Sequence, residues 1–206
     1  MADRLSIYRG ALRLLGPSNL ASLTENLPEK RALDGAWTDS VNYMLEQGMW
    51  NFSIRTVELS YDEDVDPLFG FQHAFSKPTD WVRTVSISET ADFCEGIRRY
   101  EDETNYWHAD PETIYIRYVS NDEAYGWNVG AWRQAFAKAL EAYLAFECGL
   151  PISSDRGNRN DLFNLFKQRL SDAKSKDAVD ERVREKPPGR WTRARFANGP
   201  RDRYRG

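Results

Sequence analysis

The residues that could carry chemistry in this chain are two cysteines, two histidines and two clusters of carboxylates. Cys94 and Cys148 lie far apart, and neither belongs to a closely spaced pair. In a chain without a recognisable export signal, this pattern favours two buried or half-buried free thiols over a disulfide. His73 and His108 are the only histidines. A zinc site needs Cys and His clustered at short spacings, so no metal site is predicted.

The carboxylates occupy turn-like segments at 62–64 and 101–103. A general acid needs a sheltered carboxyl with a shifted pKa, whereas clusters on turns are usually solvated. A weak cation site at Asp62, Asp64 and Asp66 is conceivable, but the stretch lacks the glycine and the final glutamate of an EF-hand loop. Nucleophile elbows, phosphate loops, dinucleotide fingerprints and HExxH are absent. We therefore predict no enzyme activity, no catalytic residue and no cofactor.

A dense set of aromatic residues follows residue 49 and allows two interpretations. The rings could stack on nucleic-acid bases, as in single-strand binders. They could instead fill the core of a small sheet that has few aliphatic residues. Acidic residues threaded among them would repel phosphates, which favours the core interpretation. The rings concerned are Trp50, Phe52, Phe71, Phe75 and Trp81.

The end of the chain is a stronger candidate for recognition. Residues 182–206 hold nine Lys or Arg and two Asp or Glu, a balance of +7, which leaves −11 on the rest of a chain whose total is −4. Planar cations alternate there with aromatics, which suits an acidic protein groove or a nucleic acid. Exposed large aromatics are unfavourable unless they dock. The predicted docking residues are Arg190, Trp191, Arg193, Arg195 and Phe196.

Length and hydropathy bound the class of protein. A chain of 206 residues with 41% hydrophobic residues can bury a core. No apolar run approaches the roughly 18 residues of a membrane span, and the first 16 residues make a poor secretory signal. We expect a soluble protein that is not secreted and does not bind membranes.

Helical periodicity marks two segments before the aromatic region and two after it. The first runs from Asp3 to a stop at Gly16, and the second from an Asn26 cap to about residue 47. A third, with apolar residues from Val129 onward, ends at Cys148 because Gly149 and Pro151 follow. A fourth spans about 158–184. The final stretch, 187–206, has no period and is predicted to be disordered when unbound.

Strand-like alternation occupies the middle of the chain. It begins at Phe52, and its phase slips near Arg55 and Thr56, which predicts a bulge there. Segments 81–88 and 112–119 alternate clearly, and 97–106 predicts one or two weaker strands. The fold class predicted is α+β and mainly α: a four-helix bundle with an inserted small antiparallel β-rich subdomain and an extended C-terminal tail. Its parts are 1–50 (helices 1 and 2), 51–125 (β-rich insert), 126–186 (helices 3 and 4) and 187–206 (flexible basic tail).

The order of these segments resembles the tail tubular protein A family, the head-to-tail adaptors of short-tailed bacteriophages (podoviruses). The resemblance covers about residues 4–196. Its motifs are ALRLLG, SLTENLPEKRALD, MWNFSIRTVEL, FGFQHAFSKPTDWVR, IYIRYVS and WRQAFAKALEAYLA. The most specific match lies within 69–83 and comprises Phe69, Gly70, Phe71, Ala74, Phe75, Pro78, Asp80, Trp81 and Arg83.

The resemblance implies a structural subunit of a dodecameric ring in the virion, at the tail or neck, made in the host cytoplasm. Its partners would be further copies of itself, the portal protein above, the tail nozzle protein below and DNA passing non-specifically through the channel. The segment Arg190 to Phe196 would dock on the portal, and Phe69 to Arg83, with Trp50 and Phe52, would be structural and interfacial. The role of 197–206 stays open.

Two other functions remain open. The chain could be a nucleic-acid-binding module that uses the basic, aromatic tail as an arm. A cell-wall hydrolase is more distant: some members of the family have been described with such an activity, but no sheltered carboxylate pair is evident.

Overall fold

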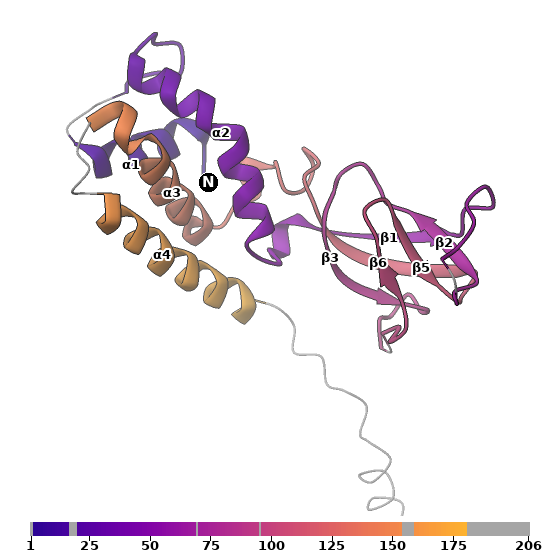
Figure 1. Ribbon diagram of the computed structural model, residues 1–206. Helices are drawn as coiled ribbons and strands as arrows, with labels where there is room; N and C mark the ends of the chain where they lie inside the picture. The colour runs from indigo at the N-terminus through magenta and orange to yellow at the C-terminus, as the bar shows by residue number, and fades with distance from the viewer. Residues whose placement is uncertain (1, 17–19, 69, 95, 154–158, 181–206) are drawn as a thin grey trace, which may run out of the picture.

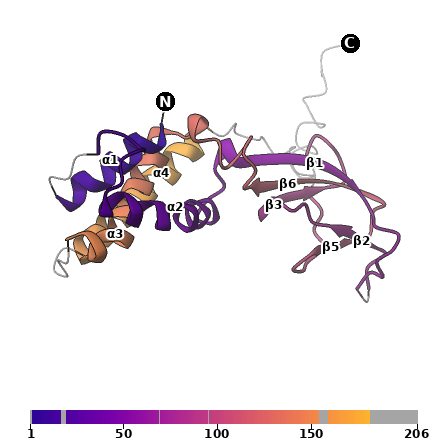
Figure 2. The same cartoon turned by 90° about the horizontal axis from the view of Figure 1, so that it is seen from above.

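The helices and the strands occupy opposite ends of an elongated molecule. Figures 1 and 2, two views of the computed structural model at right angles, show the helices gathered at one end and the strands at the other. The structure describes residues 2–16, 20–68, 70–94, 96–153 and 159–180. The chain crosses from helices to strands after α2 and returns before α3.

Local signals define the first two helices. Helix α1, Arg4–Leu15, begins with a capping box. The Asp3 carboxylate accepts a hydrogen bond from the Ser6 backbone N–H, and the Ser6 hydroxyl accepts one from the Asp3 backbone N–H. It ends at Gly16, whose φ of 144° is costly for any other residue. Helix α2, Pro28–Glu46, begins with proline in its first turn. Its N-cap is Leu27 and not the predicted Asn26.

Helix α3 is the centre of the helical part. It spans Gln134–Ser153, and α4 spans Arg159–Val179. Alanines around α3 are buried together with its large apolar residues. A helix that is apolar on every side must be enclosed, and small side chains let its neighbours approach closely. The prediction that this helix ends at Cys148 is wrong, because it continues through Gly149 and Pro151 to Ser153.

The predicted four-helix bundle with a small β insert is wrong. In such a bundle, four helices with equivalent apolar stripes surround a shared core. Here the extensive contacts between helices all involve α3, which packs against α1, α2 and α4. The β part is not a minor insert either, because its six strands form two three-stranded sheets with their own core.

The first sheet has the antiparallel order β1-β6-β3, in which β1 is Ile54–Ser60, β6 is Thr113–Ser120 and β3 is Trp81–Ser88. Strand β1 pairs with β6 in unbroken register, so the bulge predicted near Arg55 is wrong. The phase slip has another cause: a 3-10 turn, η1 (Asn51–Ser53), precedes the strand. The irregularities lie in β3, between Trp81 and Arg83 and between Thr84 and Ser86.

The second sheet has the antiparallel order β2-β5-β4, with β2 at His73–Ser76, β5 at Tyr106–Ala109 and β4 at Glu101–Asp102. The Thr84 hydroxyl donates to the Asp102 carboxylate (2.8 Å) and links β3 to β4. The backbone N–H of Asp62 donates to the carbonyl of Ala74 (2.8 Å) and links the end of β1 to β2. The sheets therefore meet along both sides of a shared apolar core.

The two ends of the molecule are packed together, not merely tethered. Val119 of β6 is fully buried in the helical core, and Val82 and Val85 of β3 pack against that core. A short 3-10 turn, η2 (Val129–Ala131), leads back into α3. The face of the first sheet nearest the helices is thus part of the helical core.

Candidate functional site

The clustered carboxylates are engaged in holding loops. Asp62 accepts from the Ser76 hydroxyl (2.7 Å) and from the Asp64 backbone N–H (3.2 Å). Asp102 accepts from Lys77 as well as from Thr84. Within the described residues, no group of three or more His, Cys, Asp or Glu side chains could hold a metal ion. In these clusters, the carboxylates of Asp62 and Asp102 therefore make structural bonds.

Lys77 lies in a cage that joins the two sheets. Its Nζ is 3.6 Å from the ring centroid of Trp81 and 5.2 Å from that of Trp107, and it donates to Asp102 and to the Glu103 carbonyl. Its side chain is 5% exposed. A buried ammonium between two indoles and a carboxylate is fully satisfied. This cage therefore connects the two sheets and stabilises the β part.

Three of the four candidate groups, Cys94, Cys148 and His108, are placed in different ways. Neither Cys94 nor Cys148 forms a disulfide, as predicted, but the expectation that both are buried or half-buried is wrong for Cys94, which is exposed. Burial, reinforced by the nearby Glu147 charge, raises the pKa of Cys148 to about 11. His108 is buried: its Nδ1 accepts from the Leu68 N–H (3.3 Å) and its Nε2 lies 3.2 Å from Glu103 Oε2.

The predicted aromatic core of the β part holds for two rings and is wrong for two others. Phe75 is fully buried in the β core, with Trp81 packed against it. Trp50 and Phe52 instead belong to the helical core, where each makes an edge contact with Phe136 at 4.9 Å between ring centroids. The Trp50 indole donates to the Met44 carbonyl (2.7 Å). These two rings therefore fill the junction between the helical part and the β part, and they do not belong to the core of the sheets.

Phe69 and Phe71 lie in the loop before β2. Phe69 lies outside the described residues. The Phe71 ring packs under the Arg99 guanidinium, 5.1 Å from its centroid, and beside His108. Arg99 also donates to the Gly70 carbonyl, where φ is +92°. Glycine is needed there because other residues adopt such a φ only with strain.

Asp80, the residue before β3, connects that strand to β1 and β6. Its carboxylate accepts from Arg55 of β1 (3.0 Å), from the Tyr118 hydroxyl (3.0 Å) and from the Ser120 hydroxyl of β6. Burial raises the pKa of Asp80, but the bonds from Ser120, Arg55 and Tyr118 outweigh burial and lower it overall.

Pro78 and Arg83 flank this network. The Trp81 N–H donates to the Pro78 carbonyl (3.1 Å), which closes the turn leading into β3. Arg83 is exposed and reaches the Glu46 carbonyl at the end of α2 (3.5 Å). The motif residues 78–83 thus organise the base of the β part where it meets the helices.

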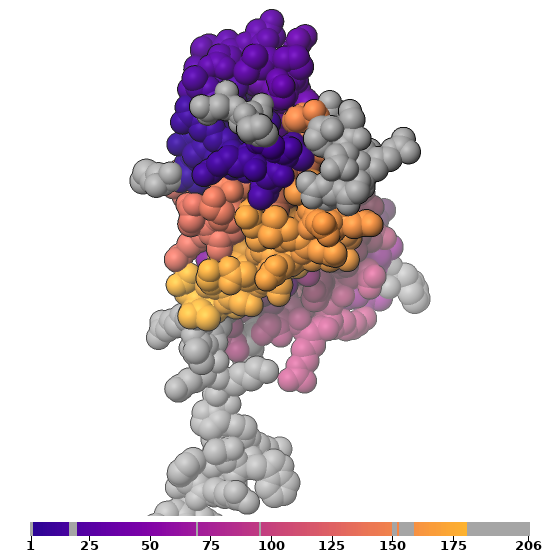
Figure 3. Space-filling view, turned by 90° about the vertical axis from the view of Figure 1, so that its left-hand side faces the viewer, coloured from indigo at the N-terminus to yellow at the C-terminus, as the bar shows by residue number. Residues whose placement is uncertain are grey.

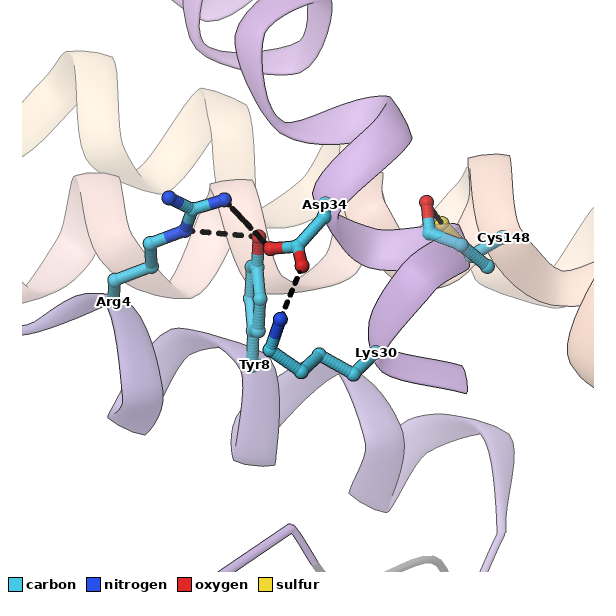
Figure 4. A network of polar contacts seen from close by, with 6 residues as sticks. Arg4, Tyr8, Lys30, Asp34 and Cys148 are labelled. Carbon is cyan, nitrogen blue, oxygen red and sulfur yellow. Dashed lines mark hydrogen bonds and ion pairs between the residues drawn. The ribbon is translucent and has the colours of Figure 1, made fainter. Parts of the chain in front are cut away.

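A polar network between α1 and α2 escaped the sequence reasoning. Asp34 accepts from Arg4 (2.7 Å), from the Tyr8 hydroxyl (2.8 Å) and from Lys30, as the close-up in Figure 4 shows. Burial raises the pKa of Asp34, but the bonds from Lys30 and Tyr8 outweigh burial and lower it overall. Burial raises the pKa of Tyr8. The only signal in the sequence was the i, i+4 spacing of Arg4 with Tyr8 and of Lys30 with Asp34.

The predicted docking residues Arg190, Trp191, Arg193, Arg195 and Phe196 lie outside the described residues. The described part ends at Asp180, at the end of α4. A groove of about 370 Å³ lies between the end of α4 and the start of α3. Sequence reasoning did not identify this groove, because residues 130 positions apart in the chain form it.

The comparisons with known proteins supply no relative. No protein-family model matches the chain, and no curated protein is similar enough to count as a homologue. The resemblance to the phage adaptors therefore stays a prediction based on motif order. Among the described residues, no helix is both long and apolar enough to span a membrane.

Proposed function

We propose that this chain is a structural adaptor subunit that forms a ring, of about twelve copies, between the portal and the tail nozzle of a short-tailed phage. The observation that carries the proposal is the elongated two-ended body, in which a helical end and a β end share a packed junction (Figure 1). A rigid subunit of this form can contact neighbours at both ends. The residues of the resemblance motif that the structure describes at 78–83 lie at that junction.

Charge also supports this proposal. The body of the chain carries −11 when residues 182–206 are set aside. A channel with acidic or neutral walls lets DNA phosphates pass without binding. The basic segment that follows would bind the portal, and a ring of copies would multiply the strength of a weak individual contact. In this proposal the protein is a virion component with interfaces in place of a catalytic site.

The test is assembly in the presence of the cognate portal. The adaptor proposal requires a ring on the portal that co-sediments with it, and a variant ending at residue 186 should fail to bind. A chain that remains monomeric and apart from the portal would exclude the proposal.

The second candidate is a nucleic-acid-binding module, favoured by the +7 balance of residues 182–206. It requires DNA binding that weakens steeply with salt and disappears on removal of residues 187–206. Loss of portal binding with unchanged DNA binding in the same truncation would favour the adaptor.

A further inference from the structure

The end of α4 is flanked by hollows on both sides. The groove of about 370 Å³ is lined by the apolar residues Trp50, Phe136 and Ala173, each at most 2% exposed, and by equal numbers of basic and acidic residues: Arg133, Lys138, Lys176, Asp172, Asp177 and Asp180. A second hollow of about 270 Å³, lined by Met49 and Ala178 among others, shares the lining residues Trp50 and Asp177 with the groove. Figure 3 shows the face on which the last turns of α4 lie beside the residues that open α3.

Apolar side chains project beside these hollows. Met49 is 46% exposed and Val179 is 85% exposed, the most exposed large apolar residue described. Both lie where α4 meets the stretch between α2 and β1. Solvated apolar groups next to a concave surface favour an apolar partner.

The charged side chains that line the groove form ion pairs that can exchange partners. Asp180 pairs with Arg133 (2.9 Å), and Asp172 pairs with Lys176 (2.8 Å). All four side chains are more than one-third exposed, so these pairs contribute little individually. An incoming arginine can take either carboxylate at small cost.

We propose that the segment Arg190 to Phe196 of the same chain folds back onto the end of α4, with Trp191 and Phe196 against the groove and the exposed side chains of Met49 and Val179. Asp180, which lines the groove, is the last described residue. Nine residues separate it from Arg190, and they span up to about 30 Å when extended. They end in Pro187-Pro188-Gly189, a sequence that favours a turn.

Docking within one chain is favoured over docking between copies by proximity. A short linker holds the segment at an effective concentration on the order of millimolar. Its aromatics match the apolar residues of the groove and the exposed Met49 and Val179, and its arginines can replace Lys176 and Arg133 as the partners of Asp172 and Asp180. In the free subunit this contact keeps the segment from other partners, and a partner must displace it. The contact itself does not depend on the adaptor function.

Hydrogen exchange on the full-length chain tests this inference. The variant Trp191→Ala/Phe196→Ala should raise exchange several-fold at the amides of 133–138 and 172–180, while the middle of α3 stays unchanged. Tyr204→Ala is the matched control, because it removes an aromatic ring from the same tail outside the docking segment. Val179→Asp, at an exposed position that does not threaten folding, should produce the same rise and should speed tryptic cleavage after Arg190 and Arg193.

Two outcomes would overturn the inference. Equal exchange in the wild type and the double variant would mean that the segment does not dock there. Protection that grows with protein concentration would assign the contact to a second copy. Neither readout involves a portal or DNA, so failure here is distinguishable from failure of the adaptor function.

Discussion

Asn51 and Asp177 lie 126 positions apart in the chain and are joined by two hydrogen bonds. The Asn51 N–H donates to Asp177 Oδ2 (3.0 Å), and the Asn51 side-chain amide donates to the Asp177 carbonyl (2.8 Å). Asn51 opens the 3-10 turn before β1, and Asp177 lies in the last turn of α4. These bonds therefore fix the entrance to the β part against the last helix.

Removing the Asp177 carboxylate should weaken this junction. Asp177 is 8% exposed, so Asp177→Ala leaves the Asn51 N–H with no acceptor at that site. We expect the free energy of unfolding to fall by about 1–3 kcal/mol. Asp172→Ala is the control, because Asp172 is exposed and pairs with Lys176 one turn away; its effect should stay within about 0.5 kcal/mol. Urea unfolding measures both, and equal effects would contradict the role assigned to Asp177.

Gly10 should resist substitution because a carboxylate lies against it. A Cβ at Gly10 would lie 2.1 Å from Cδ of Glu141, which is buried and held by Lys138. Gly10→Ala must displace that side chain and should cost about 1–3 kcal/mol of unfolding free energy. Gly35→Ala, where nothing lies within 4 Å, should instead stabilise by about 0.5–1 kcal/mol.

A double-mutant cycle separates crowding from other effects at Gly10. In a Glu141→Ala background the obstruction is gone, so Gly10→Ala should cost much less than in the wild type. The same cost in both backgrounds would show that Glu141 is not the obstacle.

Asp80 should make stability depend on pH in the acid range. Its folded pKa is lowered, so its contribution is complete above its unfolded pKa of about 4 and is lost as pH falls through the folded value. Asp80→Asn should cost about 1.5–3 kcal/mol at pH 7, and the gap from the wild type should narrow below about pH 4. Asp64→Asn, on an exposed turn, is the control and should change the free energy of unfolding at pH 7 by at most about 0.5 kcal/mol. A constant gap for Asp80→Asn down to pH 2 would contradict the assignment.

The two thiols should differ sharply in reactivity. Cys94 is exposed, whereas Cys148 is buried and has a pKa of about 11. Since the thiolate is the reactive form, an aromatic disulfide reagent at pH 8 should label one thiol per native chain and two per denatured chain. Cys94→Ser should abolish native labelling. Two reactive thiols in the native protein would contradict the burial of Cys148.

Local signals in the sequence predicted single elements well. The strand Trp81–Ser88 was predicted with its observed limits, because β-branched and aromatic residues are frequent along it, although its register with β6 shifts twice. The stop at Gly16 was also predicted, because a glycine before a proline is a local signal. The arrangement of the helices was not predictable in this way. The predicted apolar stripe of α3 included only its large side chains. The alanines of this helix are nevertheless buried in the helical core, where the other helices pack.

The short strands and the junction escaped prediction for related reasons. Strand β4 has two residues and β2 has four, too few to show a period. Trp50 and Phe52 were assigned to the sheet because alternation begins beside them, yet Phe136, more than 80 positions later, draws both into the helical core. The bond between Asn51 and Asp177 likewise joins distant positions that no local pattern connects.

The mass of the chain in solution, alone and with its cognate portal, tests the central claim most directly. The account predicts a ring of about twelve copies that co-sediments with the portal, formed either by the chain alone or only when the portal is added. A chain that stays monomeric in both samples, with none found in the portal fraction, would contradict it.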